Sequence, residues 1–440
     1  MSLAADSMGI GEHRLSTLPS GVRVVSERVP GVRSVALGFW MATGSALEPD
    51  EQAGASHLLE HMIFRGTESY RSQEIDEIFD GMGAVINAGT DRESTSLFTR
   101  VLDRHLERAF EVMSEMVWSP RFEELEAERE VVLEEIAMYE DDPQEKVFDL
   151  LGQVVFGEHP LGRAVIGHAE TVRAIDLDKL RAFHRERYPP GNVVIAAAGQ
   201  VDHDALLAMV NSAIGGSSTP SQTSPLCTPV PPDFERRVRF FGKETEQYHF
   251  CLGGRGIGRE DERRFALRVL DNILGGTSSS RLFQAIRERR GLAYSVFSFS
   301  NLHAHAGEVG LYVGTRPENL NQALSTIADE LERFVEEPAT VQELERSREN
   351  VKGRMALSLE STSSRMSRLG SSVLSQMPIL SLDELIQRID SVQLDDIREL
   401  AGEFFRPEQL SAACIGTERD LFLTALQPLG GTPAEKQSER

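Results

Sequence analysis

The chain repeats one order of secondary-structure patterns in its two halves. Each half opens on two runs of alternating apolar residues, continues through helical patterns and further strands, and closes on a short β-rich run. The opening and closing runs are 22–29, 34–43 and 192–200 in the first half, and 236–241, 248–252 and 410–416 in the second. Such a duplication predicts an α+β fold with two homologous domains, each a mixed or antiparallel sheet packed by helices.

A segment rich in Gly, Ser, Thr and Pro separates the two halves at 215–233 and is typical of a linker. We therefore expect an N-terminal domain over 11–214, a homologous C-terminal domain over 234–430, and a disordered tail over 431–440. A chain of 440 residues is too long for one ordinary hydrophobic core, which agrees with two domains.

Two histidines and one glutamate gather on a helical stretch of the first half. The sequence His57-Leu-Leu-Glu60-His61 places the imidazoles four residues apart, so on a helix they share one face and can share a metal ion. Glu60 falls on nearly the same face, where a carboxylate can act as a general base on metal-bound water. The order H-x-x-E-H is typical of inverted zinc peptidases.

Two histidines at this spacing can also be a surface pair or ordinary half-buried residues. Most of their neighbours in 55–64 are apolar, which predicts a largely buried helix. Buried polar groups need partners, and two histidines with a glutamate on one buried stripe are hard to satisfy without a metal. The context therefore favours a metal site.

Catalytic zinc uses three protein ligands and keeps one position open, so a third ligand has to come from elsewhere. The acidic stretch 120–142 has the pattern of a long helix. Glu128 and Glu135 are seven residues apart and share one face with apolar neighbours. Spacing alone leaves Glu134 and Glu135 nearly equal as the third ligand.

The second half of the sequence lacks the two histidines and the glutamate of this motif. Aligning Gly66-Thr67 with Gly276-Thr277 places Leu267, Leu270 and Asp271 at the three motif positions, so this half cannot build the same site. It carries instead a helical pattern that ends at Gly291 and passes into a strand, with the residues Arg287 and Tyr294. Their pattern alone is explained equally well by a basic helix end beside a half-buried tyrosine.

Three stretches together resemble the insulinase/pitrilysin family of zinc metallopeptidases. They are HLLEHMIFRGT at 57–67, GAVINAGT at 83–90 and EREVVLEEI at 128–136, and the similarity extends over about 15–426. The chain is most similar to bacterial relatives of the β subunit of mitochondrial processing peptidase. The resemblance implies two homologous domains arranged around a cavity, with one Zn²⁺ per chain.

The resemblance also implies roles for the residues of the first half. The zinc ligands would be His57, His61 and Glu135, which favours Glu135 over its neighbour. Glu60 would be the general base, and Glu128 would match an acid of the family that supports the ligands from behind.

Substrate would be held by further residues that match the family. Arg287 and Tyr294 would hold the substrate carbonyl and help to stabilise the oxyanion. Asn87 and Ala88 would lie on an exposed sheet edge, to which the substrate adds as another strand.

The expected function is a zinc-dependent endopeptidase that cleaves peptides or unfolded segments, with Glu60 activating a zinc-bound water. Two alternatives stay open: a non-catalytic partner or scaffold subunit of a processing-peptidase-like complex, and a metal-dependent amide hydrolase acting on a small molecule. The family's long single-chain members have twice this length. The resemblance therefore implies a homodimer with shared active sites, or a heterodimer with a paralogue.

Composition narrows the partners and the compartment. A net charge of −23 disfavours nucleic acid and anionic membranes and suits cationic peptides. No apolar run is long enough for a membrane span, and 1–14 lacks the pattern of a secretory signal. Three cysteines, far apart and odd in number, favour a reducing compartment, so we expect a cytoplasmic protein.

Overall fold

The structure is a computed structural model that describes residues 12–215, 232–337 and 339–431. The expected linker, apart from its ends, and the expected disordered tail beyond residue 431 lie outside these residues. The chain divides into two compact units. Unit 1 combines Met1–Glu134, Val165–Cys227 and Met355–Glu384, and unit 2 combines Glu135–Ala164, Thr228–Arg354 and Leu385–Arg440. Each unit therefore takes in a segment from the other half of the sequence.

The sheet of unit 1 has six strands in the order β1-β2-β6-β3-β5-β4. Neighbouring strands are antiparallel except β2 and β6, which are parallel, so the sheet is mixed, as expected. The strands are β1 (His13–Thr17), β2 (Arg23–Arg28), β3 (Ser34–Met41), β4 (Ile86–Thr90), β5 (Thr95–Leu102) and β6 (Val193–Gly199). Strand β1, which the sequence pattern did not indicate, adds one edge, and β4 forms the other.

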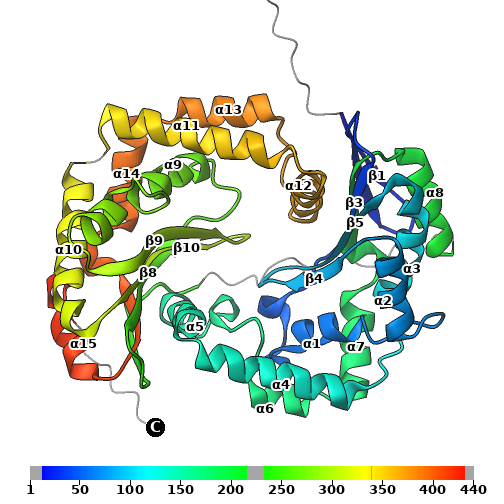
Figure 1. Ribbon diagram of the computed structural model, residues 1–440, viewed down its shortest axis with the longest axis horizontal. Coiled ribbons are helices and arrows are strands. Elements are labelled where there is room, and N and C mark those ends of the chain that lie inside the picture. Colours follow the sequence, from blue (N-terminus) through cyan, green and yellow to red (C-terminus); the bar gives the residue numbers. More distant parts are fainter. Residues whose placement is uncertain (1–11, 216–231, 338, 432–440) are drawn as a thin grey trace, which may run out of the picture. The chain divides into compact units, whose positions relative to one another are not determined.

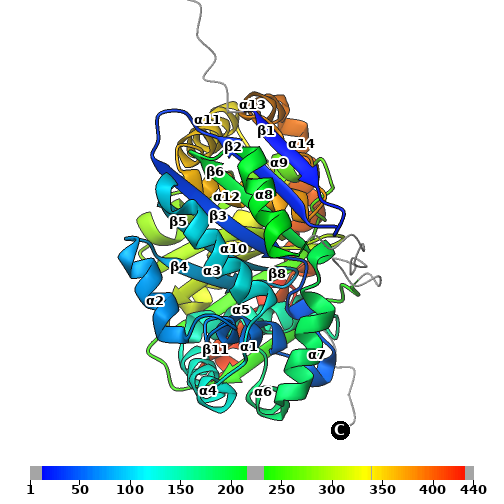
Figure 2. The same ribbon diagram turned by 90° about the vertical axis from the view of Figure 1, so that its right-hand side faces the viewer.

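Helices cover both faces of this sheet (Figure 1), which is why its central strand β6 is buried at every residue. Helices α3 (Leu106–Trp118) and α8 (His203–Ala213) lie over one face, in front of the strands in Figure 2. Helix α12 (Thr362–Leu374), from the second half of the sequence, packs on β2, β3 and β6.

Small residues and a buried ion pair hold α12 on the sheet. A Cβ added to Gly370 would lie 2.1 Å from Trp40 Nε1, so glycine is what allows this close approach. Glu27 on β2 is fully buried, contacts Arg365 and lies 3.5 Å from Arg368. A buried carboxylate is stable only when it is paired, so these arginines fix α12 against β2.

The sheet of unit 2 has the order β7-β11-β8-β10-β9, again with one parallel pair, β7 and β11. Its strands are β7 (Val238–Gly242), β8 (Tyr248–Gly256), β9 (Ala293–Leu302), β10 (Gly307–Thr315) and β11 (Ser411–Gly416). Helix α5 (Pro143–Phe156), from the first half of the sequence, packs on β8 and β11, while α9 (Arg264–Leu274) contacts β9 (Figure 1). This order repeats β2-β6-β3-β5-β4 of unit 1, which confirms the predicted duplication and fold class.

The remaining helices complete the two units. They are α1 (Ala55–Met62), α2 (Ser72–Gly81), α4 (Leu125–Asp141), α6 (Ala169–Ala174), α7 (Leu177–Arg187), α10 (Leu320–Glu336), α11 (Val341–Ser358), α13 (Leu382–Ser391), α14 (Leu394–Phe404) and α15 (Arg419–Ala425). The expected helix at 120–142 begins five residues late, because Phe122 and Glu124 adopt positive φ angles of 58° and 62° that a helix excludes. Within the described ranges no helix is both long and apolar enough to cross a membrane.

Candidate metal centre

Helix α1 is fixed in place at its first turn. Its N-cap, Gly54, has a φ of 96°, a conformation that favours glycine. The buried Glu48 accepts hydrogen bonds from the backbone N–H groups of Gly54 at 2.7 Å and Ser56 at 2.6 Å. These two bonds satisfy N–H groups that a helix start leaves without intrahelical partners, and a negative charge is favourable there. The helix then buries Leu58 and Leu59 completely, which fixes the direction of its polar face.

His57 and His61 meet Glu135 of α4. Each offers one ligand atom, and these three atoms all lie within 4.8 Å of one another. All three residues are half-buried, and the two imidazole rings are 4.7 Å apart between centroids. Two imidazole nitrogens and one carboxylate oxygen are a donor set that catalytic zinc uses, at bond lengths of about 2.0–2.2 Å. The residues present therefore fit a zinc ion after small side-chain adjustments.

The structure separates the two glutamates that sequence spacing left nearly equal. Glu134 is exposed to solvent, whereas Glu135 is half-buried and belongs to the three-residue set. Two adjacent residues on a helix point about 100° apart, so only one of them can face α1.

Glu128 precedes Glu135 by about two turns of α4 and supports His61. Its Oε1 lies 2.8 Å from His61 Nδ1, and its Oε2 contacts the side chain of Arg65. A carboxylate only accepts, so Nδ1–H of His61 donates to it and Nε2 keeps the lone pair that a metal requires. Glu128 is almost fully buried, and Arg65 balances its charge.

His57 is held in the form that binds metals. Burial, together with the charge of the neighbouring His61, lowers the pKa of His57 to about 4. The imidazole of His57 is therefore neutral near pH 7, with a nitrogen lone pair available to a cation.

Glu60 faces strand β4. Its Oε2 accepts a hydrogen bond of 2.5 Å from Oγ1 of Thr90, the last residue of that strand. Tyr188, directly after α7, is buried close by. Burial raises the pKa of Tyr188 well above its usual value, and the negative charge of Glu60 acts in the same direction. The carboxylate of Glu60 is thus set one residue before a metal-site histidine and is oriented from the sheet edge.

Arg287 and Tyr294 lie together in unit 2. Arg287 lies in a short π-helix (Phe283–Glu288), and Tyr294 follows near the start of β9. The guanidinium of Arg287 lies 4.4 Å from the centre of the Tyr294 ring, and its Nη1 donates to the Tyr294 carbonyl at 3.1 Å. Tyr294 is 77% exposed, so its side chain projects into solvent from this pair.

Asn87 and Ala88 lie on β4, which pairs with β5 alone among the strands of the described residues. Asn87 is exposed, and its Oδ1 accepts a hydrogen bond of 2.9 Å from the backbone N–H of Ala88. The expected sheet edge is therefore present, with an open row of backbone groups.

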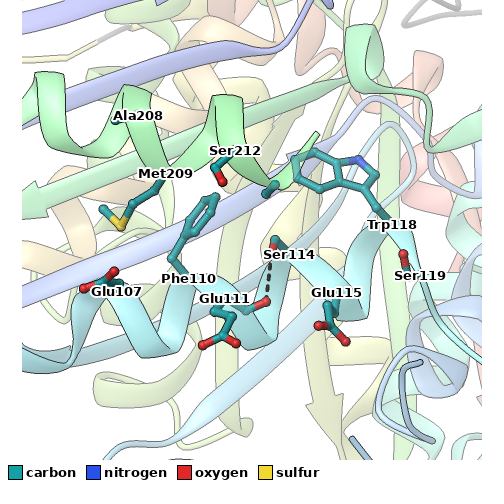
Figure 3. A pocket seen from close by; sticks show the side chains of 11 residues that line it. Glu107, Phe110, Glu111, Ser114, Glu115, Trp118, Ser119, Ala208, Met209 and Ser212 are labelled. Atoms are coloured by element: carbon teal, nitrogen blue, oxygen red, sulfur yellow. Dashed lines mark hydrogen bonds between the residues drawn. The ribbon is translucent and has the colours of Figure 1, made fainter. Parts of the chain in front are cut away.

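A separate hollow of about 500 Å³ lies between α3 and α8 (Figure 3). Glu111 and Glu115 line it together with the apolar Phe110. Both carboxylates are already engaged. Glu111 pairs with Arg108 at 2.8 Å, and Glu115 accepts a hydrogen bond of 2.8 Å from Thr67. No histidine is among the described residues that line this hollow, so they offer no second donor set of the kind found on α1.

Three residues around the metal centre have no sequence pattern that marks them: Glu48, Arg65 and Thr90. Arg65 and Thr90 stood inside the quoted motifs but carried no spacing that indicates a contact with Glu128 or Glu60. Glu48 lies in a 43–54 loop that precedes the helix, where no local pattern marks a capping carboxylate.

Comparisons with known proteins give the family of the chain. Residues 23–169 match the family description "Insulinase (Peptidase family M16)", and residues 174–351 match "Peptidase M16 inactive domain". An uncharacterized zinc protease of Streptomyces coelicolor is 40% identical over 423 residues, which cover 94% of this chain and 91% of the relative. One of Bacillus subtilis is 40% identical over 420 residues, covering 95% and 99%.

Solved structures support the same fold. A protease from Helicobacter pylori has a TM-score of 0.86 at 23% identity, covering 92% of this chain and all of that one. A structure described as the peptidase M16 inactive domain from Pseudomonas fluorescens has a TM-score of 0.84 at 21% identity, covering 92% and 98%.

The fold and the comparisons define the family of the chain, and its relatives are named zinc proteases. The chain belongs to the insulinase family, peptidase family M16. The metal set lies in the part that matches the insulinase description, whereas Arg287 and Tyr294 lie in the part that matches the inactive domain. At this level the family and the names of the relatives support a zinc metallopeptidase function.

Proposed function

We propose that the protein is a zinc-dependent endopeptidase that cleaves peptides or unfolded segments of polypeptide. The observation that carries this proposal is the convergence of His57, His61 and Glu135, with Glu60 one residue before the second histidine. A structural metal site is closed by four protein ligands, whereas three ligands beside a carboxylate suit hydrolysis.

His57, His61 and Glu135 hold the zinc in this proposal. Bound zinc supplies Lewis acidity, which lowers the pKa of water and polarises a carbonyl. Glu60 accepts a proton from the water molecule whose oxygen attacks the substrate carbonyl carbon. It then passes this proton to the amine nitrogen as the carbon–nitrogen bond breaks, and the carboxylate is restored.

Two further elements serve the substrate. The guanidinium of Arg287 and the hydroxyl of Tyr294 donate hydrogen bonds to the oxyanion that forms as water attacks. The substrate backbone pairs in an extended conformation with β4 beside Asn87 and Ala88, where the open edge supplies donors and acceptors. Binding through backbone groups favours peptides and unfolded segments, because folded proteins have few free strands.

A peptide-library digest with and without a chelator tests this function. We expect internal cleavage that stops when the metal is removed and returns with zinc. Glu60→Gln should keep zinc and lose hydrolysis, because a base is not a ligand, and Glu134→Gln is a matched control on an exposed position. A zinc-loaded protein that cleaves nothing would indicate a non-catalytic partner subunit, and cleavage of small amides alone would indicate the other hydrolase class.

Assembly as a homodimer with shared active sites is a second part of the proposal, and it rests on the resemblance to the long single-chain members. The test is complementation between Glu60→Gln and the double variant Arg287→Ala with Tyr294→Phe. Mixed and exchanged, two inactive variants should regain activity if each site draws on both subunits. A mixture that stays inactive after confirmed subunit exchange would show that each chain builds its own site. Activity that requires a paralogous chain would indicate the heterodimer.

A further inference from the structure

Thr90 joins the sheet edge to the proposed general base. It is the last residue of β4, and its Oγ1 lies 2.5 Å from Oε2 of Glu60. Both side chains are half-buried, so this hydrogen bond is partly shielded from competing water. A bond from a neutral hydroxyl to a carboxylate is charge-assisted, and 2.5 Å is at the short end of such bonds.

The hydroxyl protons around Thr90 fix the direction of this bond. Thr95 is the partner of Thr90 across the β4–β5 pair, and the Oγ1 atoms of the two residues are 3.4 Å apart. Thr95 donates its own proton to the carbonyl of Thr43 at 3.0 Å. Since each hydroxyl has one proton and a carboxylate only accepts, the proton of Thr90 goes to Glu60.

The turn after Thr90 is held from the other side. Asp91 N–H donates to the carbonyl of Ser94 at 2.7 Å, and Ser45 N–H donates to the carbonyl of Asp91 at 3.2 Å. A Cβ added to Gly44 would lie 2.2 Å from that same carbonyl oxygen, so the loop before α1 packs directly on the turn. Thr90 is therefore anchored at the end of its strand and can hold another side chain.

The geometry points to Thr90 as a positioning residue that holds Oε2 of Glu60, so that Oε1 is the oxygen that exchanges the proton. This inference rests on the proposed function. Oε1 takes a proton from water while the water oxygen bonds to the carbonyl carbon. It returns that proton to the departing amine nitrogen, and Oε2 keeps its hydrogen bond to Thr90 throughout.

The same strand then performs two tasks. Ala88 and Thr90 alternate with the exposed Asn87 along β4, so they share the face turned toward α1. A substrate paired with the edge of β4 is placed by the strand that also orients Glu60. The attacked carbonyl and the base thus take their positions from one rigid element.

Three variants test Thr90 in the zinc-loaded, full-length protein. Thr90→Val keeps the shape and removes the hydroxyl, Thr90→Ser restores it, and Thr99→Val removes a hydroxyl from the same strand pair that bonds the carbonyl of Val85 instead. We expect Thr90→Val to lower kcat by about 10- to 100-fold with KM and zinc content little changed, as for a misplaced catalytic group. Thr90→Ser should recover most of the loss, and Thr99→Val should keep kcat.

Full kcat in Thr90→Val, or an equal loss in Thr90→Ser, would overturn the inference. A loss that follows zinc content would do so as well. Crystal structures of wild type and Thr90→Val give a readout that needs no activity. We expect the Glu60 carboxylate to leave its place in the variant, and an unchanged carboxylate would also refute the role of Thr90. Wild-type protein that binds zinc and cleaves nothing would refute the proposed function alone. The position of the Glu60 carboxylate in the two crystal structures would still test the role of Thr90.

Discussion

Units 1 and 2 build the same strand order and place a helix at the same point in it. Helix α1 lies between β3 and β4 in sequence, and α9 lies between β8 and β9. In α1 this position carries His57, Glu60 and His61. In α9 the aligned positions carry Leu267 and Leu270, both buried among apolar neighbours, and Asp271. Helix α9 therefore packs in unit 2 with buried leucines at two of the three positions that carry the motif in α1.

A similar contact occurs in both units, at positions that do not align, because Asp271 corresponds to His61 and Leu270 to Glu60. Asp271 of α9 accepts a hydrogen bond of 2.5 Å from Ser298 on β9, as Glu60 accepts one from Thr90 on β4. Burial raises the pKa of Asp271, while no imidazole stands beside it in the motif positions. A helix carboxylate therefore bonds a neighbouring strand in each unit, but from non-equivalent positions, and the histidines are found in α1 alone of these two helices.

The largest expected effect comes from removing one histidine and, in parallel, its aligned residue. His61→Ala should lose zinc and lower activity by about 1,000-fold or more, since enzymatic accelerations of at least about 10⁶ depend on such groups. Asp271→Ala should keep the zinc content of the wild type. Metal analysis and peptide cleavage on both variants check this. Zinc loss in Asp271→Ala would mean that helix α9 also contributes to metal binding.

The next effect concerns the ligand that lies outside α1. Glu135→Gln should weaken zinc binding by about 100-fold, because a neutral amide is a poor ligand for zinc compared with a carboxylate. Glu134→Gln removes the same charge from the exposed neighbouring position and should change affinity little. Competition titration against a chelator of known affinity measures both. Equal weakening in the two variants would point to net charge and not to ligation.

Glu128→Gln should have an intermediate effect. The amide keeps the shape but loses the charge that orients His61 and balances Arg65, and changes behind a metal ligand typically cost about 10- to 100-fold in metal affinity. Glu130→Gln, at an exposed position of the same helix, is the control. The same chelator competition decides it, and wild-type affinity in Glu128→Gln would show that His61 needs no such support.

The smallest expected effect concerns how the two helices begin. Glu48 caps α1 from a loop, whereas the N-cap of α9, Arg263, makes no side-chain capping bond. Glu48→Ala should destabilise the protein by about 1–2 kcal/mol, since two helix N–H groups lose a partner. Urea unfolding followed by circular dichroism measures this, with the exposed Glu51→Ala as a control. Equal stability of the two variants would contradict a capping role.

Local patterns foretold much of this molecule and stopped where contacts between distant segments begin. The spacing of His57 and His61 follows from helix geometry, and the alternating apolar runs follow from strand geometry, so both could be predicted. Spacing alone could not choose Glu135 over Glu134, because a helical pattern fixes a face only to within one residue, and only the family resemblance favoured Glu135. The start of α4 was placed too early, because nothing at Phe122 or Glu124 announces a positive φ.

The exchange of helices between the two halves of the sequence could not be predicted either. Helices α5 and α12 both show apolar faces that must be buried, but an apolar face does not say which sheet will cover it. The buried ion pair of Glu27 and Arg365 joins residues from opposite halves of the sequence, and no local pattern predicts it.

The packing of α12 on the sheet of unit 1 has a consequence for folding during synthesis. All strands of unit 1 have been synthesised once β6 is complete. Helix α12 is synthesised only after β7 to β10. Until then Val25, Ala36 and Ala196 of the sheet lack the cover that Met366 and Leu369 later provide. The first half of the nascent chain must therefore wait with an apolar face open, and a translation product that ends at the linker would never close it.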